Sequence, residues 1–387
     1  MLSENGRIRL SASDLMRFMS CTHASHLDLE RLQGRGPEPA RDSEDAALLQ
    51  RYGDAHEAGH LETLRAGGDV VEIEKDQPFS QAVAATVTAL RQGPATVFQG
   101  ALEGGAWGGW SDFLERVDVP SDLGPYSYEV ADTKLKRKPS PSHLLQLVLY
   151  SDLLTPLQGR SPENAHVLLG DGTRASFRLA EYADYARQAR TRLETFVNAP
   201  WPTRPVPCAT CDLCRWRENC AAVWESEGSL FRVAGISRSQ VTKLENAGVM
   251  TMTGLAARKE NIPRLAAPTF DRLRLQARLQ THRPTKGPHH ALRDPAGGKG
   301  FDLLPEPAIG DLFYDIEGDP FYAEGGTEGL EYLHGVWDGD DFTALWAHDH
   351  TAEKQALITL FQLFDARLSA YPHAHIYHYA ASIAPGC

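Results

Sequence analysis

Polar and apolar residues alternate along 126–135, the segment YSYEVADTKL, with the two-residue period of a β-strand. Residues 107–119 show the same strand pattern, and the turn-rich segment 120–125 joins the two as a β-hairpin or meander. Because side chains two apart in a strand share a face, Asp132 and Lys134 point to the same side. We therefore expect an acid and an ammonium side by side on a half-buried surface.

Other apolar patterns divide the rest of the chain. The segment 11–32 predicts a short helix that ends near Cys21, and 33–46 predicts a loop. The remaining predicted elements are helices at 47–68, 142–157 and 179–198, strands at 69–73, 165–170 and 311–320, and a linker at 283–300. Strands mixed with helices in this way indicate an α/β fold.

Composition places the chain among ordinary globular proteins of more than one domain. It has 387 residues, of which 42% are hydrophobic and 23% are charged. The first ten residues lack the pattern of a signal peptide, and no apolar run is long enough to span a bilayer. We therefore expect a cytoplasmic protein with no membrane partner.

Charge is unevenly distributed. The net charge of −12 argues against a surface covered everywhere with phosphate-binding residues. Residues 229–290, however, contain eleven Lys or Arg against three acids. A second basic group, formed by Lys134, Lys136, Arg137 and Lys138, follows Asp132. Each group is either a solvated surface or a contact for phosphates.

Four of the six cysteines lie in thirteen residues, 208-CATCDLCRWRENC-220, whereas Cys21 and Cys387 stand apart. In a cytosolic chain, clustered cysteines indicate metal binding rather than a disulfide framework.

Asp112 and Asp132 lie on the two strands of the predicted hairpin. Carboxylates from neighbouring strands form a hard-oxygen site that suits Mg²⁺ or Mn²⁺. Lys134 beside them could orient and help to deprotonate an attacking water, while the ion stabilises charge on a phosphodiester. The alternative is a surface salt bridge between Asp132 and Lys134.

The order of these residues resembles the PD-(D/E)XK nuclease superfamily, specifically its RecB-like branch. A helical His, a strand Asp, a D/E-x-K strand and a Q-x-x-x-Y helix recur there in the order found here as His56, Asp112, Asp132-Thr133-Lys134 and Gln146 to Tyr150. The acid before x-Lys is Asp rather than the more usual Glu. The resemblance implies a restriction-endonuclease-like mixed sheet flanked by helices. It also implies that His56, Asp112 and Asp132 bind the metal, that Lys134 acts on the water, and that Gln146 and Tyr150 contact substrate or support the site.

The same resemblance gives the cysteines a role. In iron–sulfur members of the branch, such as the CRISPR adaptation nucleases and AddB-type helicase–nucleases, an upstream cysteine joins a C-x2-C-x5-C group. This implies a [4Fe–4S] cluster on Cys21, Cys211, Cys214 and Cys220 that ties the two ends of the domain together. Cys208 is then spare and Cys387 inert. The alternative is a structural zinc site formed by Cys208, Cys211, Cys214 and Cys220.

Residues 56-HEAGH-60 also match the H-E-x-x-H pattern of zinc metalloproteases. Gly59 weakens the helix between the two histidines, and the only candidates for a third ligand are undistinguished acids such as Glu72 and Glu74. A metalloprotease is therefore the less favoured alternative.

The basic segment contains 233–256, which resembles a helix–hairpin–helix element with turns at Gly235-Ile236 and Gly248-Val249. In that family the backbone amides of the hairpin bind phosphates without reading base sequence. The alternative is a plain helical connector.

The strand at 311–320 places Asp315 and Glu317 on one face. It resembles the opening of a ribonuclease H-like 3′–5′ exonuclease domain, whose later acids would follow residue 387. Relatives with this layout continue into a helicase, so the resemblance implies the front part of a nuclease–helicase, with residues after about 300 loosely held.

These observations predict four segments: a nuclease domain at 1–225, a basic helical module at 226–282, a linker at 283–300 and an incomplete ribonuclease H-like unit at 301–387. The expected function is metal-dependent hydrolysis of DNA, single-stranded or at ends, in repair or recombination with a helicase domain or subunit. The alternative is a catalytically idle DNA-binding module of a helicase–nuclease system.

Overall fold

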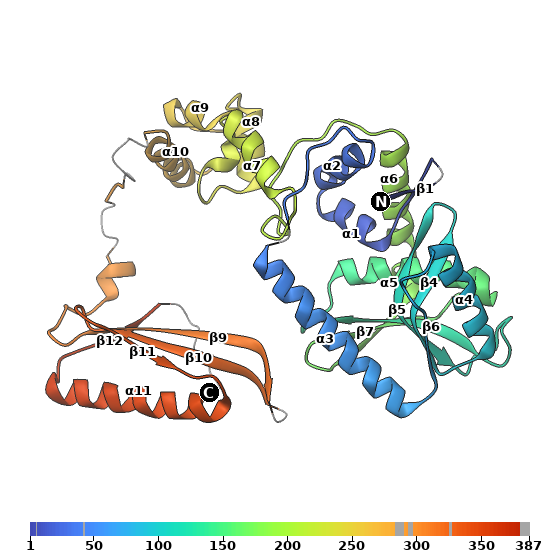
Figure 1. Ribbon diagram of the computed structural model, residues 1–387. Coiled ribbons are helices and arrows are strands. Elements are labelled where there is room, and N and C mark those ends of the chain that lie inside the picture. The colour runs from blue at the N-terminus through green and yellow to red at the C-terminus, as the bar shows by residue number, and fades with distance from the viewer. Residues whose placement is uncertain (5, 42, 283–289, 293–296, 325–326, 380–387) are drawn as a thin grey trace. The chain divides into compact units, whose positions relative to one another are not determined.

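The chain folds into two compact units, residues 1–290 and 291–387, in the computed structural model shown in Figure 1. The structure describes all residues except 5, 42, 283–289, 293–296, 325–326 and 380–387. The segments expected at 1–225 and 226–282 both lie in the first unit. Much of the linker expected at 283–300 lies outside the described residues.

Eight strands and most of the described helices belong to the first unit. The strands are β1 (Leu2–Glu4), β2 (Arg7–Arg9), β3 (Val70–Glu72), β4 (Thr96–Gly104), β5 (Trp107–Val117), β6 (Ser127–Lys134), β7 (Asn164–Leu169) and β8 (Arg174–Arg178). The α-helices are α1 (Ala12–Ser20), α2 (Thr22–Leu32), α3 (Glu44–Gly67), α4 (Phe79–Gln92), α5 (Pro141–Gln158), α6 (Ala183–Asn198), α7 (Arg217–Ser226), α8 (Arg238–Asn246), α9 (Met252–Ala257) and α10 (Ala267–Thr281). Short 3₁₀ turns occupy Leu179–Glu181 and Leu230–Arg232.

A six-stranded mixed sheet in the order β3-β4-β5-β6-β7-β8 forms the centre of this unit. Strands β4, β5 and β6 are antiparallel neighbours, and β6 pairs with β7 in parallel. A parallel pair needs a crossover connection, and α5 provides it between β6 and β7. The α/β class expected from the sequence is thus confirmed.

Helices cover both faces of the sheet (Figure 1). On one face Leu61 of α3 packs on Phe113 of β5 and Ala131 of β6. On the other face α4 and α5 pack on the strands, with α1 and α6 outside them. Because β6 lies under helices on both sides, residues 127–133 are all buried. The surface expected to be half-buried is therefore part of the interior.

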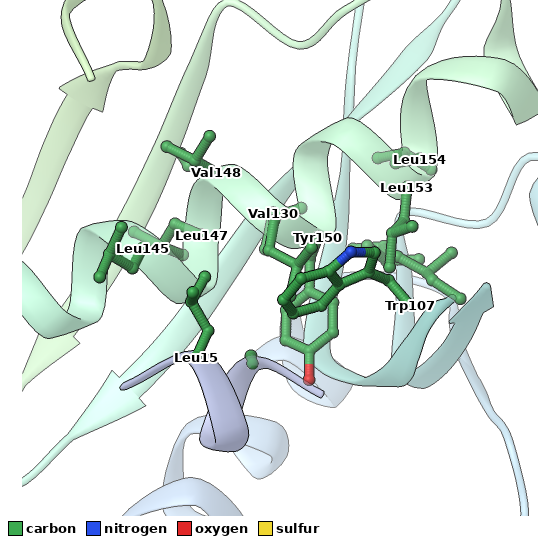
Figure 2. Packing of buried hydrophobic residues seen from close by; sticks show 14 of the residues in the cluster. Leu15, Trp107, Val130, Leu145, Leu147, Val148, Tyr150, Leu153 and Leu154 are labelled. Atoms are coloured by element: carbon green, nitrogen blue, oxygen red, sulfur yellow. The ribbon is translucent and has the colours of Figure 1, made fainter. Parts of the chain in front are cut away.

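The main core is built around α5. Figure 2 shows Leu147, Tyr150 and Leu154 of this helix in one cluster with side chains from distant segments, including Leu15 of α1 and Trp107 of β5. Buried residues occur on all sides of α5, which is the pattern of a helix enclosed by other elements. This burial fixes the helix that carries Gln146 against the strand that carries Asp132.

Most predicted elements of this unit are confirmed with shifts of a few residues at their ends. Two segments contain elements that the sequence did not predict. The short helix expected to end near Cys21 is α1, and residues 22–32 add a second helix, α2. Residues 75–106, where no element was predicted, contain α4 and β4.

The basic segment forms a helical module with its own small core. Leu230, Val241, Leu255 and Phe270 are among the side chains that fill it. Gly235 and Gly248 have φ values of +72° and +78°, a conformation that favours glycine. Each lies at a turn where the sequence predicted one, and α8 runs between them.

The second unit is a four-stranded sheet with one long helix. It contains β9 (Leu312–Glu324), β10 (Thr327–Trp337), β11 (Phe342–Trp346), α11 (His350–Ala370), β12 (Ile376–His378) and a 3₁₀ turn at Gly300–Leu303. The sheet order is β11-β10-β9-β12, and Leu360 of α11 packs on Tyr314 and Val336. In the described part of the whole chain, no helix is both long and apolar enough to cross a membrane.

Candidate active site

Asp112 and Asp132 face each other across two neighbouring strands. Phe113 of β5 pairs with Ala131 of β6, so one step further along this antiparallel ladder Asp112 comes opposite Asp132. The two carboxyl groups are hydrogen-bonded to each other. Burial raises the pKa of Asp112 well above its ordinary value, and the hydrogen bond and charge of Asp132 raise it further. A nearby cation would stabilise the charged form of two such carboxyl groups.

Two side chains contact the Asp132 carboxylate, which is 2% exposed. Gln146 of α5 donates from Nε2 to Oδ1 over 3.1 Å. The Lys134 ammonium lies against Oδ2 and also donates to the Thr133 carbonyl oxygen over 3.2 Å. The Lys134 ammonium lies beside Oδ2 but is not oriented to donate a hydrogen bond to it. No other donor among the described residues is aligned with Oδ2. Asp132 and Lys134 thus form a buried contact rather than a surface salt bridge.

Tyr150, one turn after Gln146 on α5, is 6% exposed and packs in the main core (Figure 2). A Cβ atom at Gly109 of β5 would lie 2.7 Å from its hydroxyl oxygen. The backbone of Trp110 is hydrogen-bonded to that hydroxyl, and burial raises the pKa of Tyr150 above its ordinary value. Tyr150 is therefore placed to support β5 next to Asp112.

Helix α3 packs on one face of the sheet near these residues. His56 Nε2 lies 3.5 Å from the Leu168 carbonyl oxygen on β7. The next residue, Glu57, accepts a hydrogen bond of 2.6 Å from Gln99 Nε2 of β4. Burial raises the pKa of Glu57 above its ordinary value, and the charge of Asp132 acts in the same direction. The sequence pointed to Glu57 only as the acid of the H-E-x-x-H pattern, and it gave no signal for Gln99.

The second histidine of the HEAGH segment has different neighbours. The His60 ring packs edge-on against Phe113 with centroids 4.9 Å apart, and its Nε2 lies 3.9 Å from Glu115 Oε1. Its environment is thus the packed interface between α3 and the sheet.

The basic group that follows β6 lies beside the start of α5. Lys136, Arg137 and Lys138 are exposed, and His143 in the first turn of α5 is buried. Burial and the charge of Lys134 lower the pKa of His143 to about 4, although Asp132 acts in the opposite direction. His143 is therefore neutral near pH 7, and Nδ1 accepts a hydrogen bond of 3.4 Å from the Ser140 amide.

Five cysteines come together at the other end of the unit. Cys21, at the junction of α1 and α2, accepts a hydrogen bond at Sγ from the Ala24 amide over 3.4 Å. Cys208 Sγ lies 3.7 Å from Cys211 Sγ, and Cys208 is also hydrogen-bonded to Cys21. Cys208, which the resemblance leaves out of the ligand set, therefore lies with the four that it includes.

The thiols influence one another. Burial raises the pKa of Cys220 to about 12, with further contributions from the charges of the other four cysteines. Burial and the neighbouring Cys208 raise the pKa of Cys211 to about 11. Metal ligation requires thiolates, so a bound cation would supply the charge that stabilises them.

Asp28 holds the cysteine segment against the N-terminal helices. This residue of α2 is 7% exposed. It accepts hydrogen bonds from Arg17 of α1 over 2.7 Å and from Trp216 Nε1 over 2.9 Å. Arg215 donates to the same carboxylate over 2.5 Å. The approach of Cys21 to residues 208–220 is thus fixed by the protein's own contacts.

The second unit carries the other acids that the sequence singled out. Asp315 and Glu317 of β9 are both exposed. Asp315 lines a cavity of about 760 Å³ together with aromatic residues that include Phe313, Trp337 and Tyr377. Asp311 also lines it and accepts a hydrogen bond from the His375 amide over 2.8 Å.

In the described part of the chain, no group of three or more His, Cys, Asp or Glu side chains is placed so that it could hold a metal ion as it stands. Comparison with known proteins adds no relative, because no family model and no curated protein match this sequence. The function of the site is therefore inferred from its side chains.

Proposed function

We propose that this chain is a metal-dependent nuclease that hydrolyses DNA phosphodiester bonds. The observation that carries the proposal is the carboxylate pair of buried Asp132 and half-buried Asp112, with Lys134 and Gln146 against Asp132. Removing two neighbouring acids from water costs stability unless a cation or a proton compensates their charge. Such a cost is typical of a functional site rather than of a structural one.

The donor set fits a hard divalent ion. Asp112 and Asp132 supply carboxylate oxygens, the ligands that Mg²⁺ and Mn²⁺ prefer. The resemblance adds His56, which stays a proposed ligand. A bound ion would supply Lewis-acid stabilisation of charge on the phosphate and would acidify a bound water.

The protein's own side chains have distinct parts in this proposal. Gln146 fixes the Asp132 carboxylate through its 3.1 Å hydrogen bond, and Tyr150 supports the strand that carries Asp112. Lys134 holds the attacking water and stabilises negative charge as the water oxygen bonds to phosphorus. The water gives up a proton to the solvent, the ester P–O bond breaks, and the departing oxygen takes up a proton from the solvent.

The fold that we propose is restriction-endonuclease-like. Its support is the mixed sheet with helices on both faces and the position of the acids on adjacent central strands. The basic helical module is proposed to bind phosphates through backbone amides at the Gly235 and Gly248 turns and through its cationic side chains. A helicase domain or subunit remains the proposed partner.

We further propose that Cys21, Cys211, Cys214 and Cys220 hold a [4Fe–4S] cluster. The support is that thiols far apart in sequence meet at one place. Anaerobically purified protein should be brown, and Cys21→Ser and Cys214→Ser should both lose the colour while Cys208→Ser keeps it. A colourless protein that contains one zinc, unaffected by Cys21→Ser, would assign the metal to Cys208, Cys211, Cys214 and Cys220.

The function is tested with end-labelled single- and double-stranded DNA. We expect cleavage by the full-length protein in Mg²⁺ or Mn²⁺, and none in excess EDTA. DNA binding without cleavage in any divalent ion would favour the idle binding module. Hydrolysis of an unstructured protein substrate that His56→Ala abolishes would favour the metalloprotease.

A further inference from the structure

Gln99 of β4 has an unusual backbone conformation beside the candidate site. Its φ is +55°, in the left-handed region that side chains other than glycine rarely adopt. Phe98 pairs with Phe113 and Gly100 pairs with Ser111, so Gln99 lies opposite Asp112 but outside the regular ladder. A non-glycine residue in this region costs about 1 kcal/mol or more, and such strain clusters at functional sites.

The distorted backbone lets the Gln99 side chain reach helix α3. Its Nε2 donates a 2.6 Å hydrogen bond to Glu57 Oε1. Because Gln99 lies opposite Asp112, this hydrogen bond brings the Glu57 carboxylate toward Asp112, whose pKa the charge of Glu57 helps to raise. The hydrogen bond thus restrains a third acid at the edge of the site.

The amide oxygen of Gln99, Oε1, is buried beside the candidate site. Gln99 is 6% exposed, and no partner for its Oε1 atom lies among the described residues. Leaving a buried acceptor without a donor costs about 1–3 kcal/mol. Gln99 lies opposite Asp112, and an amide oxygen has the chemistry of a contact to a hydrated divalent ion.

We propose that Gln99 is a positioning residue that holds Glu57 as the third carboxylate of the Mg²⁺ or Mn²⁺ site. The inference rests on the proposed function because it concerns the same site. Groups that orient a metal site from outside its ligand set are worth about 10–100-fold in metal affinity. The strain at Gln99 is offset by this restraint on Glu57.

The test is the dissociation constant for Mn²⁺, measured by isothermal titration calorimetry on the full-length protein. Gln99→Gly removes the amide but tolerates the positive φ, so the fold should keep or slightly gain thermal stability without metal. We expect the dissociation constant to rise about tenfold or more. Arg264 is an exposed residue of the helical module with φ +62°, so Arg264→Gly is the matched control and should leave Mn²⁺ binding unchanged.

A double-variant cycle separates positioning from an independent effect. Glu57→Gln should weaken Mn²⁺ binding by itself, and adding Gln99→Gly should weaken it little further, because both changes remove the same restrained carboxylate. Fully additive losses, or wild-type affinity in Gln99→Gly, would overturn the proposal. Mn²⁺ binding that follows this pattern without DNA cleavage would support the positioning role and refute only the nuclease. Absence of Mn²⁺ binding by the wild-type protein would overturn both.

Discussion

At the scale of single residues, Asp132 depends on contacts from three directions. Asp112 meets it across the strand pair, Gln146 contacts it from α5, and Lys134 comes from its own strand. Each contact is made inside the protein, where charge interactions are stronger than in water. The carboxylates are thus held in place before any ligand binds, which is the preorganisation that catalysis by charge stabilisation requires.

Acid should destabilise the protein through Glu115. Burial would raise the pKa of this carboxyl, but the nearby His60 and two hydrogen bonds from Arg174 outweigh burial and lower it to about 2. Because the folded-state pKa is depressed, the stabilisation is complete above the ordinary pKa and is lost as the pH falls toward 2. We predict that Glu115→Gln lowers the free energy of unfolding at pH 7 by about 1–2 kcal/mol, a figure reduced because Arg174 is partly exposed.

The measurement is urea denaturation from pH 7 to pH 3. The difference in free energy of unfolding between wild type and Glu115→Gln should narrow below pH 4.5. Glu103 is exposed, so Glu103→Gln is the control and should have the free energy of unfolding of the wild type at each pH. A gap that stays constant with pH would contradict the role given to Glu115.

Residue patterns predicted part of this site in advance. The two-residue period correctly placed Asp132 and Lys134 on one face, because β6 is a regular strand. The contact between Glu57 and Gln99 was not predicted, since it depends on a left-handed residue within β4 that no periodicity reveals. The convergence of Cys208 with Cys21 was likewise not expected, because it depends on the path of the chain around Asp28.

At the scale of elements, helix α5 was predicted, whereas helix α4 and the irregular strand β4 were not. The segment 142–157 became α5 within one residue at each end. By contrast, most of β4 is buried on both faces and therefore lacks polar–apolar alternation, and it contains two glycines and the distorted Gln99. Pairing with β3 and β5 in the buried sheet, rather than a local sequence pattern, stabilises β4.

Docking of the cysteine segment on α1 and α2 should depend on Asp28. We predict that Asp28→Ala lowers the free energy of unfolding by about 3 kcal/mol, because it removes a buried carboxylate with three charged or polar donors. The metal content of the cysteine site should fall as well, since Cys21 would no longer be held near the others. Chemical denaturation and elemental analysis measure the two effects.

Asp184 provides the matched control. It pairs with Arg187 on the exposed surface of α6, where an ion pair contributes little. Asp184→Ala should therefore change neither stability nor metal content appreciably. Equal effects of the two substitutions would show that Asp28 does not hold the segment.

At the scale of the whole molecule, the chemistry proposed here belongs to the first unit. The carboxylate pair, five of the six cysteines and the basic helical module lie within residues 1–290. Each unit has its own hydrophobic core. The sequence predicted this separation from the composition of 283–300, although it could not show that the helical module belongs to the first unit.

A protein shortened after His290 should fold and keep its function. We predict that its melting temperature and its rate of DNA cleavage match those of the first unit in the full chain, because the core around α5 is complete without residues 291–387. Calorimetry and the cleavage assay measure this directly. An insoluble fragment, or one that binds DNA but no longer cleaves it, would show that the second unit contributes to the site.

The most direct test of the central claim is the rate of Mg²⁺-dependent DNA cleavage by Asp132→Ala beside Asp118→Ala. Asp132 is buried in the carboxylate pair, whereas Asp118 is exposed beyond the end of β5. We predict that Asp132→Ala lowers the cleavage rate by about 10³-fold or more while DNA binding persists, because it removes charge that acts on the transition state. Asp118→Ala should cleave at the wild-type rate. Undiminished cleavage by Asp132→Ala would contradict the account.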